Sequence, residues 1–103
     1  MFIFLTFSNA FAGSATFGTL STVHTFANGV VLVYTNGSRS EVPACATNQP
    51  ARFAINGSTA GGKVLAAAIF ANYSLGKQVT IIGSGTCDVY GDTESISYIY
   101  TND

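Results

Sequence analysis

Three carboxylates stand close together near the C-terminal end of the chain. Asp88, Asp92 and Glu94 surround Tyr90-Gly91 in a segment that we expect to be the turn before the last strand. Carboxylate oxygens are ligands that calcium prefers, and extracellular modules use weak sites of this kind. The spacing is not that of an EF-hand loop, and a solvated acidic turn is the simpler interpretation. We therefore predict no metal site and keep the three residues as calcium candidates only.

His24 is the only histidine, so it is the only side chain that titrates near neutral pH without being perturbed. A serine–histidine–acid site would also need an activated serine, and the sequence contains no G-x-S-x-G elbow. The position of His24 in an alternating segment beside Phe26 favours a surface or half-buried side chain. We predict no catalytic residue and no enzymatic activity.

The segment from Gly57 to Lys63 matches the phosphate-binding pattern G-x-x-x-x-G-K. Val64, however, stands where a phosphate-binding loop has the serine or threonine that holds magnesium, and no later strand ends in a second acidic ligand. We interpret the segment as the capped, glycine-rich start of a helix and expect no cofactor.

Composition excludes several classes of partner. Charged residues make up 9% of the 103 residues, with four Lys and Arg against five Asp and Glu. Such a chain has no basic stripe to contact phosphates, which argues against a nucleic-acid partner and against electrostatic attachment to anionic lipid. The length is that of one domain.

Residues 1–12 form an apolar run that ends in Ala10-Phe11-Ala12, the small-x-small pattern after which signal peptidase cleaves. We predict a signal peptide over residues 1–12, a single domain over residues 13–103, and a secreted or periplasmic location. The run is too short for a stable membrane anchor. Because no Lys or Arg precedes Arg39, we expect the signal to be truncated or the true start codon to lie upstream. The alternative is an edge strand over residues 2–7.

Cys45 and Cys87 are the only cysteines. One histidine and two distant cysteines do not make a zinc site, and no basic residue close in sequence activates either thiol. Two lone cysteines in a small exported domain most often pair. We therefore predict a disulfide between them, which would stabilise the fold by about 4 kcal/mol through the entropy of the unfolded chain.

The tyrosines stand among many serines, threonines and asparagines. Aromatic faces with hydroxyl groups and little charge suit contacts with a sugar or a protein, although the same rings serve equally well in a core. We expect them to divide about evenly between the two roles. Tyr90 is the binding candidate, because a residue in a turn is the most exposed. The five are Tyr34, Tyr73, Tyr90, Tyr98 and Tyr100.

Hydrophobic periodicity and turn residues predict five strands and one helix. Gly18 should bend a long first strand, and Asn28-Gly29 is the strongest hairpin signal. Thr59 is a good N-cap and Gly76 suits the end of the helix, in which Val64 and Leu75 should be buried while Asn72 faces water. The strands are predicted over residues 16–26, 30–35, 52–55, 78–83 and 94–101, and the helix over residues 64–75.

This order of elements predicts a β-rich α+β fold, namely an OB-fold-like five-stranded antiparallel barrel with one helix between strands 3 and 4. Pro43-Ala44-Cys45, Leu75-Gly76-Lys77 and the segment from Gly83 to Cys87 resemble a family of small, uncharacterised exported bacterial proteins. More distantly, the placement of the cysteines and the helix is similar to the B subunits of pertussis-type and subtilase-type toxins, which are OB-folds that assemble into glycan-binding pentamers.

The resemblance implies a fold more than a function, because no sugar-binding residue of those toxins can be matched to this sequence. The expectation is an exported, non-catalytic binding module for a glycan or a protein, which self-associates as a homo-oligomer. The alternative is an exported structural or inhibitory domain whose role is a protein contact.

Overall fold

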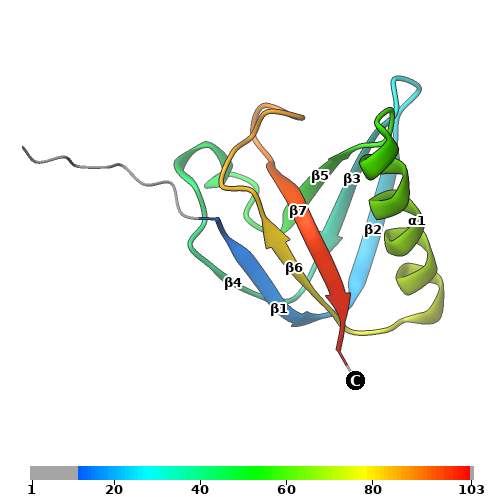
Figure 1. Cartoon of the computed structure of the whole chain (residues 1–103). Helices are drawn as coiled ribbons and strands as arrows, with labels where there is room; N and C mark the ends of the chain where they lie inside the picture. Colours follow the sequence, from blue (N-terminus) through cyan, green and yellow to red (C-terminus); the bar gives the residue numbers. More distant parts are fainter. Residues whose placement is uncertain (1–11, 103) are drawn as a thin grey trace, which may run out of the picture.

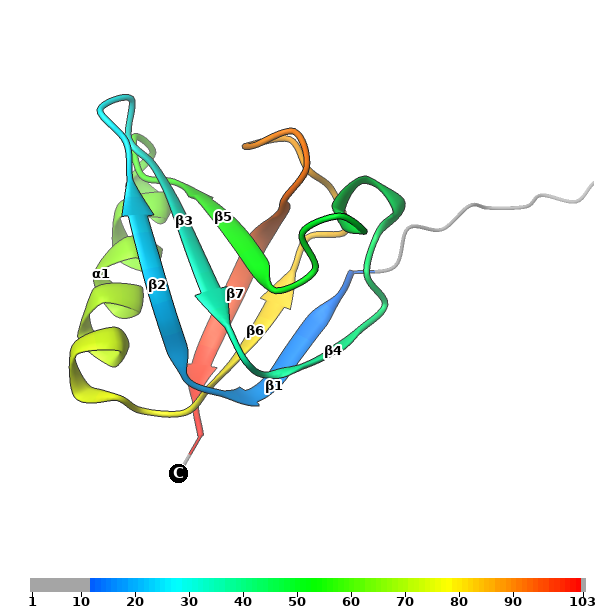
Figure 2. The same ribbon diagram turned by 180° about the vertical axis from the view of Figure 1, so that it is seen from behind.

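The strands form one curled, mixed sheet that makes a half-barrel (Figures 1 and 2). The computed structural model describes residues 12–102, so the predicted signal peptide lies almost entirely outside the described residues. The sheet has seven strands in the order β2-β3-β5-β7-β6-β1-β4. Their bounds are β1 Ser14–Gly18, β2 Leu20–Thr25, β3 Val30–Thr35, β4 Ser38–Ser40, β5 Arg52–Asn56, β6 Val79–Gly83 and β7 Glu94–Thr101.

The predicted long first strand is broken into β1 and β2 at a sharp bend. Phe17 has a positive φ of 54°, and the backbone of Gly18 lies so close to that of Gly37 that any side chain at position 18 would clash. β1 pairs with β4 and β6, whereas β2 pairs with β3. The bend therefore carries the chain from one half of the curled sheet to the other.

The predicted hairpin at Asn28-Gly29 is confirmed. Gly29 has a φ of 92°, and the Asn28 Oδ1 accepts a hydrogen bond from the backbone N–H of Val30 at 3.1 Å. β3 is buried along most of its length, as its unbroken apolar sequence predicts: Val33 is in the core, and Leu32, outside the core cluster, is also buried.

The sheet is not wholly antiparallel, which corrects the expected barrel. β5 and β7 run parallel, with Phe53 opposite Glu94 and Ala54 opposite Ser95, while the other pairs are antiparallel. The described chain is thus a β-rich α+β fold with a mixed sheet. The long connection through α1 and β6 makes this parallel pairing sterically accessible.

Alternation along β7 changes phase at a bulge. Gly83 of β6 pairs with Ile96, but the preceding Ile82 pairs with Tyr98, so Ser97 is an extra residue on β7. Ile96 and Ile99 therefore both reach the core. In a regular strand, side chains alternate between the two faces, and Tyr98 would lie on the same face as Ile96.

The helix α1 (Ala60–Leu75) has the predicted caps at Thr59 and Gly76, but it begins at Ala60 rather than at the predicted Val64, directly after the Thr59 cap. Thr59 Oγ1 accepts from the backbone N–H of Gly62 at 2.9 Å, and Gly76 is left-handed with a φ of 66°. α1 packs against β2, β5 and β7 (Figure 2) and adds Ala66 and Ile69 to the core.

The buried stripe of α1 is rotated from the predicted one. Val64 and Leu75 are 70% and 72% exposed, whereas Asn72 is half-buried, with its Nδ2 donating to Ala68 O at 2.8 Å and its Oδ1 accepting from Thr101. Asn72 faces the sheet because its Oδ1 accepts a hydrogen bond from Thr101 of β7, while its Nδ2 is satisfied within the helix.

The core fills the inside of the half-barrel with aliphatic residues and one aromatic ring, that of Phe53. Every strand except β4 contributes, which ties the two halves of the sheet together. The core residues are Ala15, Leu20, Val31, Val33, Phe53, Ile55, Ala66, Ile69, Val79, Ile81 and Ile96.

The predicted disulfide is confirmed. Cys45, in the 3₁₀ turn η1 (Ala44–Ala46), is bonded to Cys87 across 42 positions of sequence, with the Cα atoms 6.2 Å apart. Disulfides persist in oxidising compartments, which indicates a non-cytoplasmic location. Over residues 12–102, no helix has the length and apolar character needed to span a bilayer.

Candidate binding pocket

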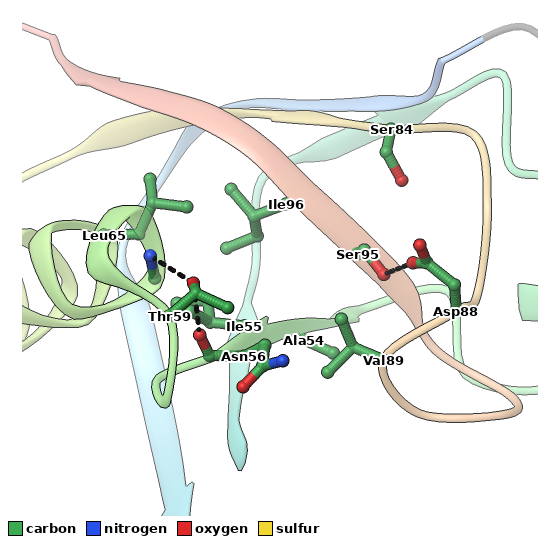
Figure 3. A pocket seen from close by; sticks show the side chains of 11 residues that line it. Ala54, Ile55, Asn56, Thr59, Leu65, Ser84, Asp88, Val89, Ser95 and Ile96 are labelled. Atoms are coloured by element: carbon green, nitrogen blue, oxygen red, sulfur yellow. Dashed lines mark hydrogen bonds between the residues drawn. The ribbon is translucent and has the colours of Figure 1, made fainter. Parts of the chain in front are cut away.

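A pocket of about 230 Å³ opens between the end of β5, the start of α1, the start of β7 and the loop over residues 84–89 (Figure 3). We call it the polar pocket, because polar side chains surround an apolar floor. The apolar residues are Ala54, Ile55, Leu65, Val89 and Ile96; the others are Asn56, Thr59, Gly62, Ser84, Asp88 and Ser95.

The helix cap positions one side of the polar pocket. Thr59 Oγ1 donates to Asn56 O at 3.1 Å while it accepts from Gly62, and Asn56 Oδ1 accepts from the backbone N–H of Ser58 at 3.0 Å. Within the described part of the chain, the Nδ2 of Asn56 makes no hydrogen bond. The amide is exposed, so it can donate to a ligand.

Asp88 supplies the charge on the opposite side. Its Oδ1 accepts from Ser95 Oγ at 2.7 Å, the bond drawn in Figure 3, and from Thr86 Oγ1 at 3.1 Å. The bond from Ser95, and after it the bond from Thr86, lowers the pKa of Asp88 below its ordinary value of 3.8, so the group is a carboxylate at neutral pH. Its Oδ2 accepts no hydrogen bond from any other residue among 12–102 and is available to a ligand.

The other two calcium candidates do not join Asp88. Asp92 Oδ1 lies 2.6 Å from Arg52 Nη2, and Glu94, fully buried, lies 2.7 Å from Arg39 Nη2. In the described residues, no three His, Cys, Asp or Glu side chains gather where they could hold a metal ion. Glu94 is also not in a solvated turn, since it is the first residue of β7.

Arg52 of β5 links the sheet to the loop that contains Tyr90. Its Nε donates to Thr93 Oγ1 at 2.8 Å and its Nη1 to Tyr34 Oη at 3.2 Å, and its guanidinium lies 5.5 Å from the ring centre of Tyr90. Burial opposes the charge on Arg52, but hydrogen bonds and attraction to Tyr34 and Asp92 outweigh burial and raise its pKa. The loop is thereby held against β5 beside the pocket.

The sequence led us to expect that the tyrosines divide evenly between core and surface. The structure corrects this expectation, because no tyrosine among the described residues belongs to the core. Tyr90 is 37% exposed and stacks on Phe26 with ring centres 5.9 Å apart, and it is less exposed than Tyr73, Tyr98 and Tyr100. Tyr34 is half-buried, and none of the five belongs to the core. Aliphatic side chains fill the inside of the half-barrel, which leaves the phenol rings outside the core.

His24 and the segment from Gly57 to Lys63 are the two remaining candidates from the sequence. His24 is exposed, with its ring 5.9 Å from that of Tyr34, and no hydrogen bond joins it to a serine or an acid in the described chain. The glycine-rich segment is a helix start: a side chain at Gly62 would clash with the carbonyl oxygen of Asn56. The interpretation of this segment as capped, glycine-rich packing is confirmed.

Sequence reasoning missed Asn56 and Ser95 as pocket residues. Both carried ordinary signals, since Asn56 opens a turn and Ser95 alternates with apolar residues. Only the parallel pairing of β5 with β7, which the sequence did not predict, brings these strand ends together.

Comparisons of this chain with protein families, with curated proteins and with solved structures found no match.

Proposed function

We propose that the protein is an exported, non-catalytic recognition module and that its polar pocket binds a carbohydrate. The observation that carries the proposal is the convergence of one ionised carboxylate, Asp88, with the free amide of Asn56 over an apolar floor. A sugar ring presents hydroxyl groups at its edge and C–H groups on its face, so it needs both kinds of wall.

Each polar wall has a complementary task. The Oδ2 of Asp88 accepts a sugar hydroxyl in a charge-assisted hydrogen bond, and the Nδ2 of Asn56 donates to a ring or hydroxyl oxygen. Leu65 and Val89, the half-buried apolar residues of the pocket, contact the C–H face. The volume of about 230 Å³ is below the roughly 300–1,000 Å³ of sites for drug-sized ligands. One sugar unit is therefore the expected occupant.

Export is supported by the disulfide and by the apolar segment that ends at Ala12. An OB-fold is supported by the strand order, if β1 and β2 are counted as one broken strand and the three-residue β4 is left out: five strands then follow one another with α1 between the third and the fourth. The OB-like fold proposed here includes the observed parallel pairing of β5 with β7.

A glycan array followed by calorimetry tests the recognition role. Asp88→Asn keeps the Oδ1 acceptor for Ser95 and Thr86 but replaces Oδ2 by an amide, so the fold should persist while affinity falls about tenfold to 100-fold. Glu41→Gln is the matched control, because Glu41 is an exposed acid outside the pocket. The proposal would be contradicted if no glycan binds at millimolar concentration. It would also be contradicted if Asp88→Asn and Glu41→Gln bind the glycan with equal affinity.

A protein contact is the second candidate function, favoured by a specific observation. Tyr98 and Tyr100 stack with ring centres 6.5 Å apart on β7 and are 52% and 49% exposed. Low charge does little to oppose association of such a surface with a second copy. Light scattering at increasing concentration should show a homo-oligomer that Tyr98→Ser dissociates; a monomer at every concentration would exclude self-association through this surface.

A further inference from the structure

Glu94 occupies a buried site that the recognition role does not use. Its side chain is fully buried at the start of β7. Oε1 accepts from Arg39 Nη2 at 2.7 Å, and Oε2 accepts from two backbone N–H groups, those of Gly13 and Gly85, each at 2.9 Å. One cation therefore faces the carboxylate, and the second oxygen meets only neutral donors.

Glycines make room for this carboxylate. A Cβ at Gly13 would lie 2.6 Å from both Arg39 Nη2 and Glu94 Oε1, and a side chain at Gly83 would overlap the carboxylate itself. The carbonyl of Gly13 accepts from the N–H of Gly83 at 2.7 Å, which fixes Gly13 in register beside β6. The backbone nitrogen of Gly13 is thus aimed at Glu94 by contacts on both sides.

Ala12 is exposed, whereas Gly13 is buried. The bond between them is the one that follows the small-x-small pattern of Ala10 and Ala12. The position predicted for cleavage from the sequence therefore coincides with the residue whose nitrogen contacts the buried acid.

We propose that Ala12–Gly13 is the processing site and that Glu94 is the receptor for the new N-terminus. Hydrolysis by a signal peptidase consumes one water and breaks the amide bond, leaving a carboxylate on Ala12 and, at neutral pH, an ammonium group on Gly13. This ammonium replaces the amide N–H at Oε2. The inference rests on the proposed export and not on the proposed ligand.

Cleavage places a second positively charged group beside the buried Glu94 carboxylate, in addition to Arg39. Arg39 also donates to Pro50 O at 2.7 Å, and its Nε is buried without a partner in the described residues, so Arg39 is imperfectly placed to neutralise Glu94 alone. The bond at Oε2 already has a charged acceptor, and an ammonium donor adds the Coulomb attraction of an ion pair to it. The processed chain is therefore more stable than its precursor.

The test uses the exported protein and the reactivity of its α-amine. The full chain, preceded by a short basic segment, is expressed in a bacterium, and the N-terminus of the exported product is read by mass spectrometry; the expected first residue is Gly13. Acylation of its α-amine should be about tenfold slower in the folded protein than in urea, since the group is buried and paired. Lys63 and Lys77, both exposed, are internal controls that should change little.

Two variants separate the receptor role from simple packing. Glu94→Gln should restore fast acylation of Gly13 in folded protein. If that variant does not fold, a cleavage-blocked precursor such as Ala12→Phe provides the comparison, and its folding equilibrium constant should be about tenfold lower than that of the processed chain. A different first residue, fast acylation in the folded wild type, or equal equilibrium constants would overturn the inference. Failure to bind glycans would not affect these readouts.

Discussion

Asp88 is held by one oxygen and open at the other, which allows it to serve the fold and a ligand at once. Ser95 and Thr86 donate to Oδ1, so the orientation of the carboxylate does not depend on a ligand. Pre-orientation lowers the entropy cost of binding, because the side chain is already fixed. The residue is therefore the natural target for separating stability from recognition.

The effect of pH on stability through Asp88 can be predicted from the direction of its pKa shift. Its pKa is lowered below 3.8 because hydroxyl groups of Ser95 and Thr86 stabilise the charged form. The hydrogen bonds thus contribute stability that is present above the ordinary pKa and is lost as pH falls through the lowered one. NMR of the carboxyl carbon should show a midpoint below 3.8, and Ser95→Ala should raise it. A midpoint at or above the ordinary value in the wild type would contradict the hydrogen-bond geometry.

Three neighbouring acids in the sequence have three different environments in the fold. Asp88 is exposed, Asp92 pairs with Arg52, and Glu94 is buried with Arg39. The arginines are 40 and 55 positions away from their partners in the sequence. Local spacing carries no information on such pairs, which explains why the sequence favoured a solvated acidic turn, kept the three acids as calcium candidates only, and missed the ion pairs.

The start of α1 shows how closely an element is specified by single residues. Gly61 has open space around its missing side chain, whereas a side chain at Gly62 would overlap Asn56 O. Gly61→Ala should therefore stabilise the protein by up to about 1 kcal/mol through helix propensity. Gly62→Ala should destabilise it by about 3 kcal/mol through overpacking. Urea denaturation of the two variants measures both; shifts of the same sign would show that the helix start is wrongly placed.

Elements were predictable from local signals, whereas their pairing was not. The bounds of β3 and β7, the hairpin at Gly29 and both caps of α1 follow from hydrophobic periodicity and turn chemistry. The bulge at Ser97 and the parallel pairing of β5 with β7 depend on distant backbone contacts. The polar pocket depends on the same pairing, so only its member Asp88 was singled out in advance.

At the scale of the whole molecule, a small core is reinforced by one covalent link. The disulfide joins the η1 turn, which precedes β5, to the loop that lines the polar pocket. The disulfide thus restrains the loop between β6 and β7, which contains Cys87 and lies outside the named strands. The predicted disulfide is the feature of overall architecture that the sequence identified most directly, because two cysteines leave one possible pair.

Removal of the disulfide should be costly. Replacement of Cys45 and Cys87 together by serine should lower the free energy of unfolding by about 4 kcal/mol, since the unfolded chain regains the entropy of a closed loop. Denaturant unfolding measures the change, and mass analysis without reductant should find no free thiol in the wild type. Two alkylatable thiols in the exported protein, or an unchanged unfolding midpoint, would contradict the predicted role.

Mapping of the bound sugar by NMR tests the recognition role most directly. The glycan that binds best on the array is titrated into the oxidised protein, and the backbone amide shifts are followed. We expect the largest changes on the end of β5, the start of α1, residues 84–89 and the start of β7, and Asp88→Asn should strongly reduce them at a sugar concentration near the wild-type dissociation constant. Shifts centred instead on Tyr98 and Tyr100, or no shifts with any glycan, would contradict the proposed role of the polar pocket.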